Sequence, residues 1–296
     1  MRNETIRKLQ EMRLSAMAGA YMTQLEHPEN FSNMTFDERF ALIVDHESDV
    51  RLNNKLKRLI RNAHFPNSQA DLADIQYLPD RHLDRGLIHL LSTNAYIEKS
   101  RDIILCGATG SGKTFLANAL GMNACRAGYK ALYLRLPDFF VEYALAAARN
   151  KQQDYTKKLQ NVRLLILDEF LLVPVKPPQQ ESLLELLERR SGNTSTIYCS
   201  QYSFAGWHEQ LGGGAIADSI LDRIIHGSYK LEIKGDVSMR QRLAEAEKAE
   251  ELNSVRKDCN RKAVHREWTA PSCVFTGSQI AYRVALTCIL GGSETA

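Results

Sequence analysis

The sequence predicts an α/β protein, in which helices flank a parallel sheet and a small all-helical region stands in front. Two observations support this prediction. Short runs of Leu, Ile and Val alternate with amphipathic segments through the middle of the chain, whereas residues 1–65 contain no strand-like alternation. Continuous apolar runs are typical of strands that are buried on both faces, as in a parallel sheet covered by helices.

Residues 1–66 are predicted to form a helical N-terminal domain. Its longest helix is expected to begin near Thr35, because Glu38 stands three residues further on, as a capping box requires. Apolar residues then recur at mostly helical spacing, namely Phe36, Phe40, Ile43, Val44, Leu52, Leu56, Leu59 and Ile60. This spacing predicts an apolar face along the helix.

Residues 67–247 are predicted to form the second domain, which contains five strands. These are the runs RDIILCG, KALYLRL, VRLLILDEF, TSTIYCS and YKLEIKG, which begin at residues 101, 130, 162, 194 and 229. Helices are expected between them, notably from Lys113 to about Ala127 and in PPQQESLLELLERR, where proline marks the first turn. Residues 248–296 show no sustained period and are predicted to be a disordered or weakly packed tail.

Composition limits the function classes only weakly. A formal net charge of +3 over 296 residues is too small to identify a partner. None of the six cysteines has metal-ligand or redox spacing, so they are interpreted as structural thiols. No apolar run approaches the length of a membrane span and no targeting segment is recognisable, so we expect a cytoplasmic protein without membrane contact.

The segment GATGSGKT, from Gly107 to Thr114, fits the phosphate-loop pattern G-x-x-x-x-G-K-[ST]. Its glycines let backbone N–H groups turn inward around phosphates, and the following helix points its positive end at them. Lys113 is expected to reach the β- and γ-phosphates, and the Thr114 hydroxyl to ligate Mg²⁺. The predicted nucleotide-binding residues are Gly107, Ala108, Thr109, Gly110, Ser111, Gly112, Lys113, Thr114 and Phe115.

An acidic pair follows the predicted strand LLIL, about 54 residues beyond the loop. Asp168 is predicted to hold Mg²⁺, partly through water, because ligands of open α/β sheets bind at the carboxyl ends of the strands. Glu169 is predicted to be the general base that activates water. A solvated turn is the alternative for an isolated acidic pair. Together the two motifs indicate nucleotide hydrolysis, and the lack of a guanine-reading N-K-x-D motif favours ATP over GTP.

Ser200 and Gln201 end the fourth predicted strand. A polar side chain at this position can lie between the γ-phosphate and the attacking water. An ordinary Ser/Gln turn is the alternative interpretation.

Arg223 is predicted to stabilise charge on the nucleotide of a neighbouring subunit. The apolar face of the predicted helix consists of Ile216, Ile220 and Ile224, and Arg223 lies outside this face. A surface ion pair with Asp218 or Asp222 is the alternative. Arg240, in GDVSMRQR, is a candidate for a second sensor.

A basic stripe lies in the segment VRLNNKLKRLIRNAHF, residues 50–65, which contains no Asp or Glu. Its basic residues are Arg51, Lys55, Lys57, Arg58 and Arg61. Because Arg51, Lys55 and Arg58 fall on one side of a helix, they can neutralise several phosphates of double-stranded DNA. A solvated helix face is the alternative. No recognition-helix signature is present, so backbone contact is expected rather than base readout.

The order of these motifs resembles that of the IstB-type helper ATPases of bacterial insertion sequences, which are AAA+ proteins close to the DnaC helicase loaders. The blocks that carry the resemblance are CGATGSGKTFLANALG, LLILDEF, YCSQYSFAGWHEQLGG and ADSILDRIIHGSYKLEIKGDVSMR. It covers roughly residues 1–247 and implies an AAA+ fold, ATP-dependent self-assembly on duplex DNA and delivery of that DNA to a partner transposase. It also implies that Ser200 is the first sensor and Arg223 the inter-subunit finger.

Two other functions stay open from the sequence. A helicase loader would use the same fold and a front end that binds a replicative helicase. A metabolic phosphate-loop kinase would need an acceptor site, which the segment PDFFVEYALAAARNKQQD does not show. The relatives lack a helical lid domain, so the resemblance assigns no role to Arg240.

Overall fold

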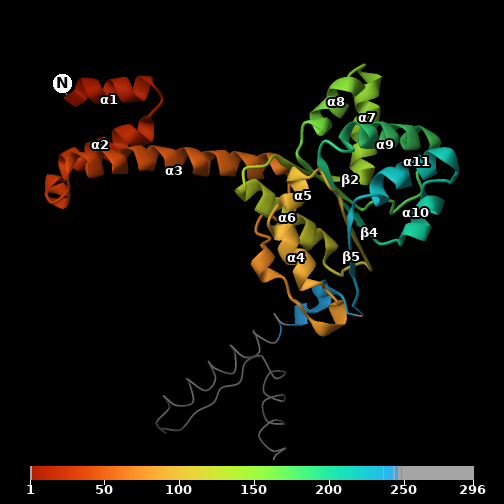
Figure 1. Ribbon diagram of the computed structural model, residues 1–296. Helices are drawn as coiled ribbons and strands as arrows, with labels where there is room; N and C mark the ends of the chain where they lie inside the picture. Colours follow the sequence, from red (N-terminus) through yellow and green to blue (C-terminus); the bar gives the residue numbers. More distant parts are fainter. Residues whose placement is uncertain (1, 236, 243, 246–247, 249–296) are drawn as a thin grey trace, which may run out of the picture. The chain divides into compact units, whose positions relative to one another are not determined.

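A computed structural model of the chain describes residues 2–235, 237–242, 244, 245 and 248 (Figure 1). Within these residues the strands are β1 (Ile103–Gly107), β2 (Ala131–Arg135), β3 (Leu164–Asp168), β4 (Ser195–Ser200) and β5 (Tyr229–Ile233). They form one sheet in the order β2-β3-β4-β1-β5, and every pairing is parallel. The five predicted strands and the parallel sheet are therefore confirmed.

Helices precede and separate the strands. They are α1 (Arg2–Glu11), α2 (Ser15–Glu26), α3 (Phe36–Ala63), α4 (Arg85–Ser92), α5 (Ala95–Glu98), α6 (Lys113–Arg126), α7 (Leu136–Ala148), α8 (Gln152–Gln160), α9 (Pro177–Arg190), α10 (Phe204–Gln210) and α11 (Gly214–Ile225). Short 3-10 turns occur at η1 (Pro28–Phe31), η2 (Leu72–Asp74) and η3 (Pro79–Arg81). None of the described helices has the length and apolarity that a membrane span requires.

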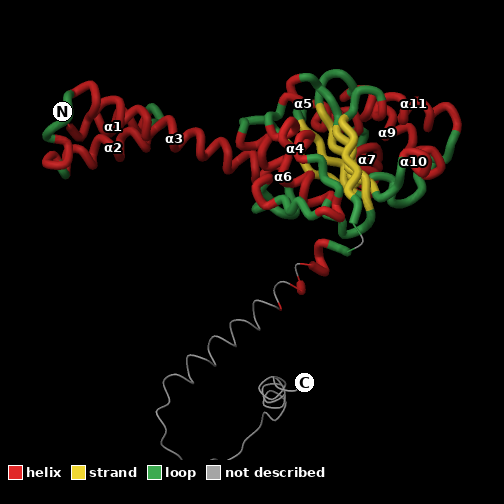
Figure 2. The backbone as a smooth tube through the Cα atoms, turned by 60° about the horizontal axis from the view of Figure 1, so that its bottom comes forward, coloured by secondary structure: helices red, strands yellow, loops and turns green. Residues whose placement is uncertain are grey.

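The sheet is covered on both faces, and Figure 2 shows helices on either side of the strands. Alternate residues of β1 enter different cores, because successive side chains of a strand point to opposite faces. Ile103 and Leu105 pack with α6, whereas Ile104 packs with residues of α9 and α11. This two-sided burial explains why the strands read as continuous apolar runs.

Helix α3 begins as predicted. Thr35 is its N-cap, and Thr35 and Glu38 form both hydrogen bonds of a capping box. The second half of α3 packs on α6 and β2 through Leu56, Leu59 and Ile60. The left-handed residue His64 ends the helix.

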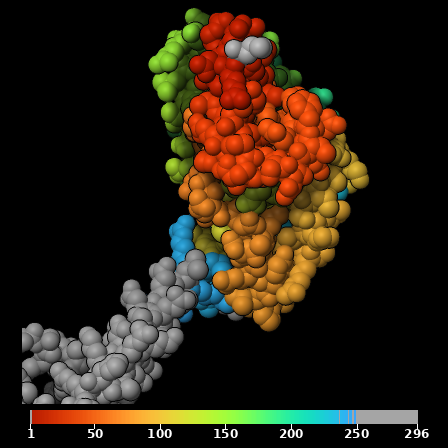
Figure 3. Space-filling view, turned by 90° about the vertical axis from the view of Figure 1, so that its left-hand side faces the viewer, coloured from red at the N-terminus to blue at the C-terminus, as the bar shows by residue number. Residues whose placement is uncertain are grey.

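The first half of α3 departs from the predicted apolar face. Phe36 is 77% exposed, Phe40 stacks against it with 6.0 Å between ring centroids, and only Ile43 of the predicted apolar residues is buried there. Helix α2 packs on this half, and α1 packs on α2. These N-terminal residues form the red and orange surface that faces the viewer in Figure 3. The periodic spacing therefore marked a helix correctly but did not mark which residues are buried.

By their internal contacts, the described residues up to Arg242 form one compact unit. The helical character of the N-terminal region is confirmed, whereas the boundary between residues 1–66 and 67–247 stays a prediction. The predicted tail at 248–296 lies outside the described residues, apart from Lys248.

Candidate active site

The phosphate loop lies between the end of β1 and the start of α6. Gly112 precedes α6 with φ +95°, a backbone conformation that glycine adopts without a steric cost. A Cβ atom at Gly107 would lie 2.3 Å from the carbonyl oxygen of Ile233. The close approach of β5 thus explains the first glycine of the motif and the left-handed turn explains the last.

Lys113 folds back over this loop. Its Nζ donates to the carbonyl oxygens of Gly107 and Ala108, at 2.7 and 2.8 Å. Burial lowers the pKa of Lys113, while the nearby Asp168 carboxylate acts in the opposite direction. The ammonium group therefore lies inside the concave loop, where it can exchange these carbonyl partners for phosphate oxygens.

The two predicted magnesium ligands are in contact. The hydroxyl of Thr114, in the first turn of α6, donates to Asp168 Oδ2 at 2.8 Å. The Tyr133 hydroxyl donates to the same oxygen at 2.8 Å. Hydroxyl and carboxylate oxygens are the hard ligands that Mg²⁺ prefers, so this pair fits the metal that the motif predicts. Sequence reasoning missed Tyr133, which looks like an ordinary residue of a buried strand.

Glu169 is held by a second residue that the sequence did not single out. Arg135, the last residue of β2, donates from Nη2 to Glu169 Oε2 at 2.6 Å. The hydrogen bond to Glu169 and its charge raise the pKa of Arg135. Glu169 has φ +53°, a left-handed conformation uncommon for a residue other than glycine. The predicted base is therefore at the site but is paired with a cation.

Ser200 does not contact the phosphate loop. It is 1% exposed, and its Oγ accepts hydrogen bonds from Trp207 Nε1 at 2.9 Å and from the Tyr202 backbone at 3.2 Å. Gln201 makes the loop contact instead, because its Oε1 accepts from the Thr109 hydroxyl at 2.7 Å. Of the two residues, Gln201 is therefore the one whose side chain contacts the phosphate loop. The reason is strand alternation, which places Ser200 on the same face as Tyr198.

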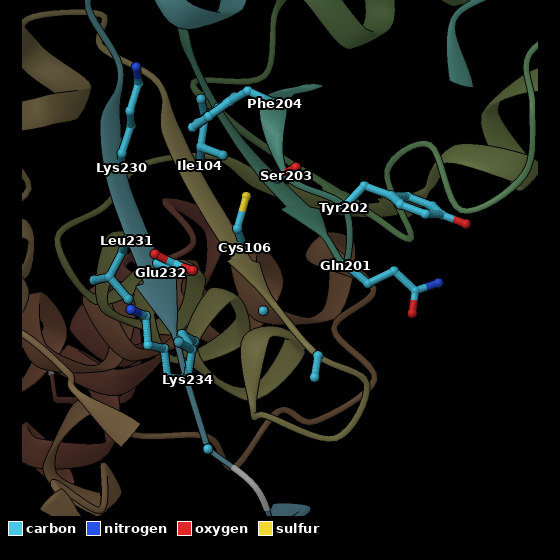
Figure 4. A pocket seen from close by; sticks show the side chains of 14 residues that line it. Ile104, Cys106, Gln201, Tyr202, Ser203, Phe204, Lys230, Leu231, Glu232 and Lys234 are labelled. Atoms are coloured by element: carbon cyan, nitrogen blue, oxygen red, sulfur yellow. The ribbon is translucent and has the colours of Figure 1, made fainter. Parts of the chain in front are cut away.

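A pocket of about 630 Å³ borders the start of the loop (Figure 4). Cys106 and the polar side chains of Lys230, Glu232 and Lys234 line it, on the sheet face opposite to α6. Phe204 closes one side, with Lys230 Nζ 4.7 Å from its ring centroid. Burial raises the pKa of Cys106 to about 11, so its thiol stays protonated near neutral pH.

Arg223 lies on α11 and forms an ion pair within its own chain. Its Nη2 donates to Glu188 Oε1 of α9 at 2.8 Å, and its Nη1 donates to the Ser219 carbonyl at 2.8 Å. The alternative of an ion pair with Asp218 or Asp222 is wrong, because these carboxylates lie 3.2 Å from His208 and His226. Glu188 was missed because it is 35 residues away in the sequence.

Two segments brace the phosphate loop from outside. Arg81, 6% exposed, donates to the Ser111 carbonyl at 2.9 Å and to the Gln76 carbonyl at 2.7 Å. The Met239 N–H donates to the Gly110 carbonyl at 2.9 Å. The segment that contains Arg240 therefore reaches the loop through its backbone, while Arg240 itself is exposed. No sequence pattern singled out Arg81, which lies 30 residues before Ser111.

The predicted DNA-binding residues lie on the outer side of α3. Arg51, Lys55, Lys57, Arg58 and Arg61 are all exposed. Arg51 pairs with Glu47 at 2.7 Å, and among the described residues no ion pair involves the other four. Because Leu56, Leu59 and Ile60 hold the opposite side of the helix on the core, this basic face is fixed in position.

The model of the protein family described as "IstB-like ATP binding protein" matches residues 7–247. The matched range includes the phosphate loop and the acidic pair. The chain belongs to this family. It is 37% identical over 243 residues to the insertion sequence ATP-binding protein y4uH of Sinorhizobium fredii, across 81% of this chain and 96% of that relative. It is 31% identical to the insertion sequence IS21 ATP-binding protein of Pseudomonas aeruginosa, across 73% and 80%.

The fold also resembles that of AMPPCP-bound DnaA from Aquifex aeolicus, with a TM-score of 0.52 and 20% identity. The alignment covers 63% of this chain and 56% of the DnaA chain, so it spans little more than half of DnaA. This likeness is one of fold, and it agrees with the predicted parallel sheet flanked by helices. The family and the phosphate loop together identify ATP as the nucleotide that the IstB-like chain binds.

Proposed function

We propose that this IstB-like protein is a magnesium-dependent ATPase that assembles on duplex DNA and recruits or stimulates a partner transposase. The observation that supports it best is the 2.8 Å contact between Thr114 and Asp168, with Glu169 next to it. This contact brings the two nucleotide motifs together at the carboxyl edge of a parallel sheet, where ligands of such sheets bind.

In the proposed hydrolysis, Lys113 exchanges the loop carbonyls for phosphate oxygens, and Thr114 and Asp168 would hold Mg²⁺. The metal supplies positive charge that offsets the charge developing on the phosphates. Glu169 leaves Arg135 and accepts a proton from water as the water oxygen bonds to the γ-phosphorus. The bond from that phosphorus to the β–γ bridging oxygen breaks, and ADP and phosphate leave.

Assembly between copies is assigned to Arg223. Its guanidinium is about one-third exposed and is paired with Glu188, itself half exposed, so water screens the pair and makes it weak. A phosphate of a neighbouring copy can therefore replace Glu188 as its partner at little cost. This exchange would make ATP the link between adjacent copies.

Contact with DNA is assigned to the basic face of α3. Each lysine or arginine that neutralises a phosphate releases a counterion, so affinity should fall steeply with salt. The absence of ion pairs at Lys55 and Arg58 among the described residues leaves both cations available. Contact with the DNA backbone, rather than base reading, is the expected mode.

The test of ATP-dependent assembly uses the full-length chain with duplex DNA, magnesium and a non-hydrolysable ATP analogue. Light scattering and electron microscopy should show multimers on DNA only when all components are present. Lys113→Ala should lose assembly, whereas Lys99→Ala, at an exposed lysine outside the loop, should keep it. A wild-type chain that stays monomeric under these conditions contradicts the proposal.

The DNA surface is tested separately. Lys55→Glu/Arg58→Glu should weaken duplex binding and flatten its dependence on salt by about two phosphate contacts. Lys99→Glu/Lys176→Glu makes the same change of charge at exposed positions on other elements and should bind as the wild type. Equal losses in both variants would show a general charge effect and remove α3 as the DNA surface.

The partner is tested by pull-down on DNA. A transposase encoded beside this chain should bind the ATP-assembled protein more tightly than it binds DNA alone. Capture of a replicative helicase, without any effect on strand transfer by the transposase, would replace transposition by helicase loading.

A further inference from the structure

The Asp168 carboxylate is almost fully buried, with 6% exposure, and each of its oxygens has a partner. Oδ2 accepts two hydroxyl donors, Thr114 Oγ1 and Tyr133 Oη, both at 2.8 Å. Oδ1 accepts the Glu169 backbone N–H at 2.8 Å. Since a buried carboxylate needs such partners, these three donors together fix the direction in which Asp168 points.

Tyr133 reaches Asp168 from the neighbouring strand. In the register of β2 and β3, Tyr133 stands opposite Ile166 and Arg135 stands opposite Asp168. Tyr133 and Arg135 share a face because strand side chains alternate, and the length of the tyrosine ring carries its hydroxyl one position further along. The ring packs against the core beneath α6, so the hydroxyl is held by packing as well as by its hydrogen bond.

The two hydroxyl donors differ in what happens when the metal binds. Thr114 is itself a predicted magnesium ligand, so its hydroxyl oxygen would be needed by the ion. Tyr133 lies on another element and keeps its hydrogen bond to Oδ2. We propose that Tyr133 is a positioning residue, which holds the Asp168 carboxylate in the orientation that magnesium binding requires. The inference rests on the proposed magnesium-dependent ATPase and adds a residue to it.

Residues that orient a metal ligand from behind commonly change metal affinity by about 10-fold to 100-fold when they are removed. The competing explanation is that Tyr133 only packs the edge strand β2. The two explanations separate cleanly because phenylalanine keeps the ring and its packing and removes only the hydroxyl. A packing role predicts no change in metal affinity for Tyr133→Phe.

The chain contains a matched control. The Tyr143 hydroxyl donates to the Glu185 carboxylate at 2.8 Å, the same distance and chemistry, between α7 and α9. It contacts neither the phosphate loop nor Asp168. Tyr143→Phe therefore removes an equivalent hydrogen bond without touching the site.

The experiment titrates magnesium into the full-length wild type and the two variants, with a fluorescent ATP analogue as the probe of binding. In EDTA all three should bind the analogue equally. Tyr133→Phe should then need about 10-fold more Mg²⁺, or more, to reach half of the magnesium effect. Turnover at saturating Mg²⁺ should stay within about threefold of the wild type, because the hydroxyl acts through metal affinity rather than on the reacting atoms.

Three outcomes decide the matter. A magnesium midpoint for Tyr133→Phe that matches both the wild type and Tyr143→Phe overturns the positioning role. An equal shift in both variants, accompanied by equal losses of melting temperature, also overturns it, because the effect is then one of stability. A wild type whose affinity ignores Mg²⁺ overturns the proposed metal site itself, and the wild-type titration alone identifies that case.

Discussion

The two ends of the sheet bury charge in opposite ways. Before β1, at the amino end, Asp102 lies beside Arg190 of α9 and accepts hydrogen bonds from the Thr196 N–H and the Tyr198 hydroxyl. Arg190, 2% exposed, donates to four oxygens, those of Leu159 O, Val162 O, Ser195 O and Thr196 Oγ1. At the carboxyl end, Lys113, Glu169 and Arg135 are only partly enclosed, and Asp168 lies buried beside them.

The difference lies in whether the partners can be exchanged. Arg190 is bonded mainly to backbone carbonyls of two separate segments, residues 159–162 and Ser195, so it cannot move without opening the core. Lys113 is bonded to carbonyls of a loop that phosphates can replace, and Arg135 is paired with Glu169 at the surface. The amino end thus stabilises the fold, and the carboxyl end holds the groups of the proposed active site on partners that a ligand could displace.

The largest expected effect is on ATP turnover, and it comes from removing the proposed base at the carboxyl end of the sheet. Glu169→Gln should lower ATP turnover by about 10²-fold to 10⁴-fold, because glutamine cannot accept the proton of water. ATP affinity should be retained, since the phosphate contacts of Lys113 are untouched. Phosphate release and binding of a fluorescent ATP analogue measure the two effects. Turnover at the wild-type rate would exclude Glu169 as the base.

At the amino end of the sheet, Arg190→Ala should destabilise the fold by about 3–5 kcal/mol, because it leaves three buried backbone carbonyl oxygens without their donor. Urea denaturation followed by circular dichroism measures the loss. Lys113→Ala is the comparison and should change the free energy of unfolding by about 1 kcal/mol or less, because its partners are loop carbonyls that water can reach. Similar losses in the two variants would remove the distinction between the two ends.

The sequence predicted the features that depend on local chemistry. The five strands, the Thr35 capping box and the phosphate loop each depend on residues that are close together in the sequence. They could therefore be predicted without knowing the fold. Asp168 could be placed because a carboxylate directly after a buried strand emerges at a known edge of the sheet. Its contact with Thr114 follows from the parallel order of the strands.

The missed features depend on which strands are neighbours and which faces they share. Tyr133 and Arg135 reach Asp168 and Glu169 only because β2 pairs with β3, which no local pattern states. Ser200 and Gln201 were treated alike, although alternation sends the first into the core and leaves the second at the loop. The contact between Arg81 and the Ser111 carbonyl could not be predicted either, because the two residues lie far apart in the sequence.

The pH dependence of stability gives a third test, at the amino end. Burial raises the pKa of Asp102 from 3.8 to about 6, against the opposing effects of the Thr196 hydrogen bond and Arg190. A raised carboxyl pKa contributes stability that is fully present below pH 3.8 and is lost as pH rises through about 6. The difference corresponds to about 3 kcal/mol.

Asp102→Asn should remove this dependence, because asparagine keeps an acceptor for the Thr196 N–H but does not titrate. The free energy of unfolding, measured in urea between pH 4 and pH 7, should fall less steeply for the variant than for the wild type. Parallel curves would show that Asp102 carries no shifted pKa in the folded chain.

The smallest expected effect tests whether Arg135 restrains Glu169. These side chains are 46% and 33% exposed, so their ion pair is worth about 1 kcal/mol or less. Arg135→Ala should free the carboxylate and raise ATP turnover without DNA by at most about fivefold. Arg189→Ala is a close control, because Arg189 and Glu185 form a 2.9 Å pair with 38% and 33% exposure, away from the loop.

Whether ATP turnover rises or falls in Arg135→Ala decides between two roles for this arginine. A rise in turnover for Arg135→Ala, without a rise for Arg189→Ala, would mean that the Arg135 ion pair holds Glu169 away from its catalytic role and must break before Glu169 acts. A fall would mean that Arg135 aligns Glu169 for catalysis, so that the pair is a fixed one, as at the amino end. In that case the contrast between the two ends would hold for Lys113 and the phosphates but not for the base.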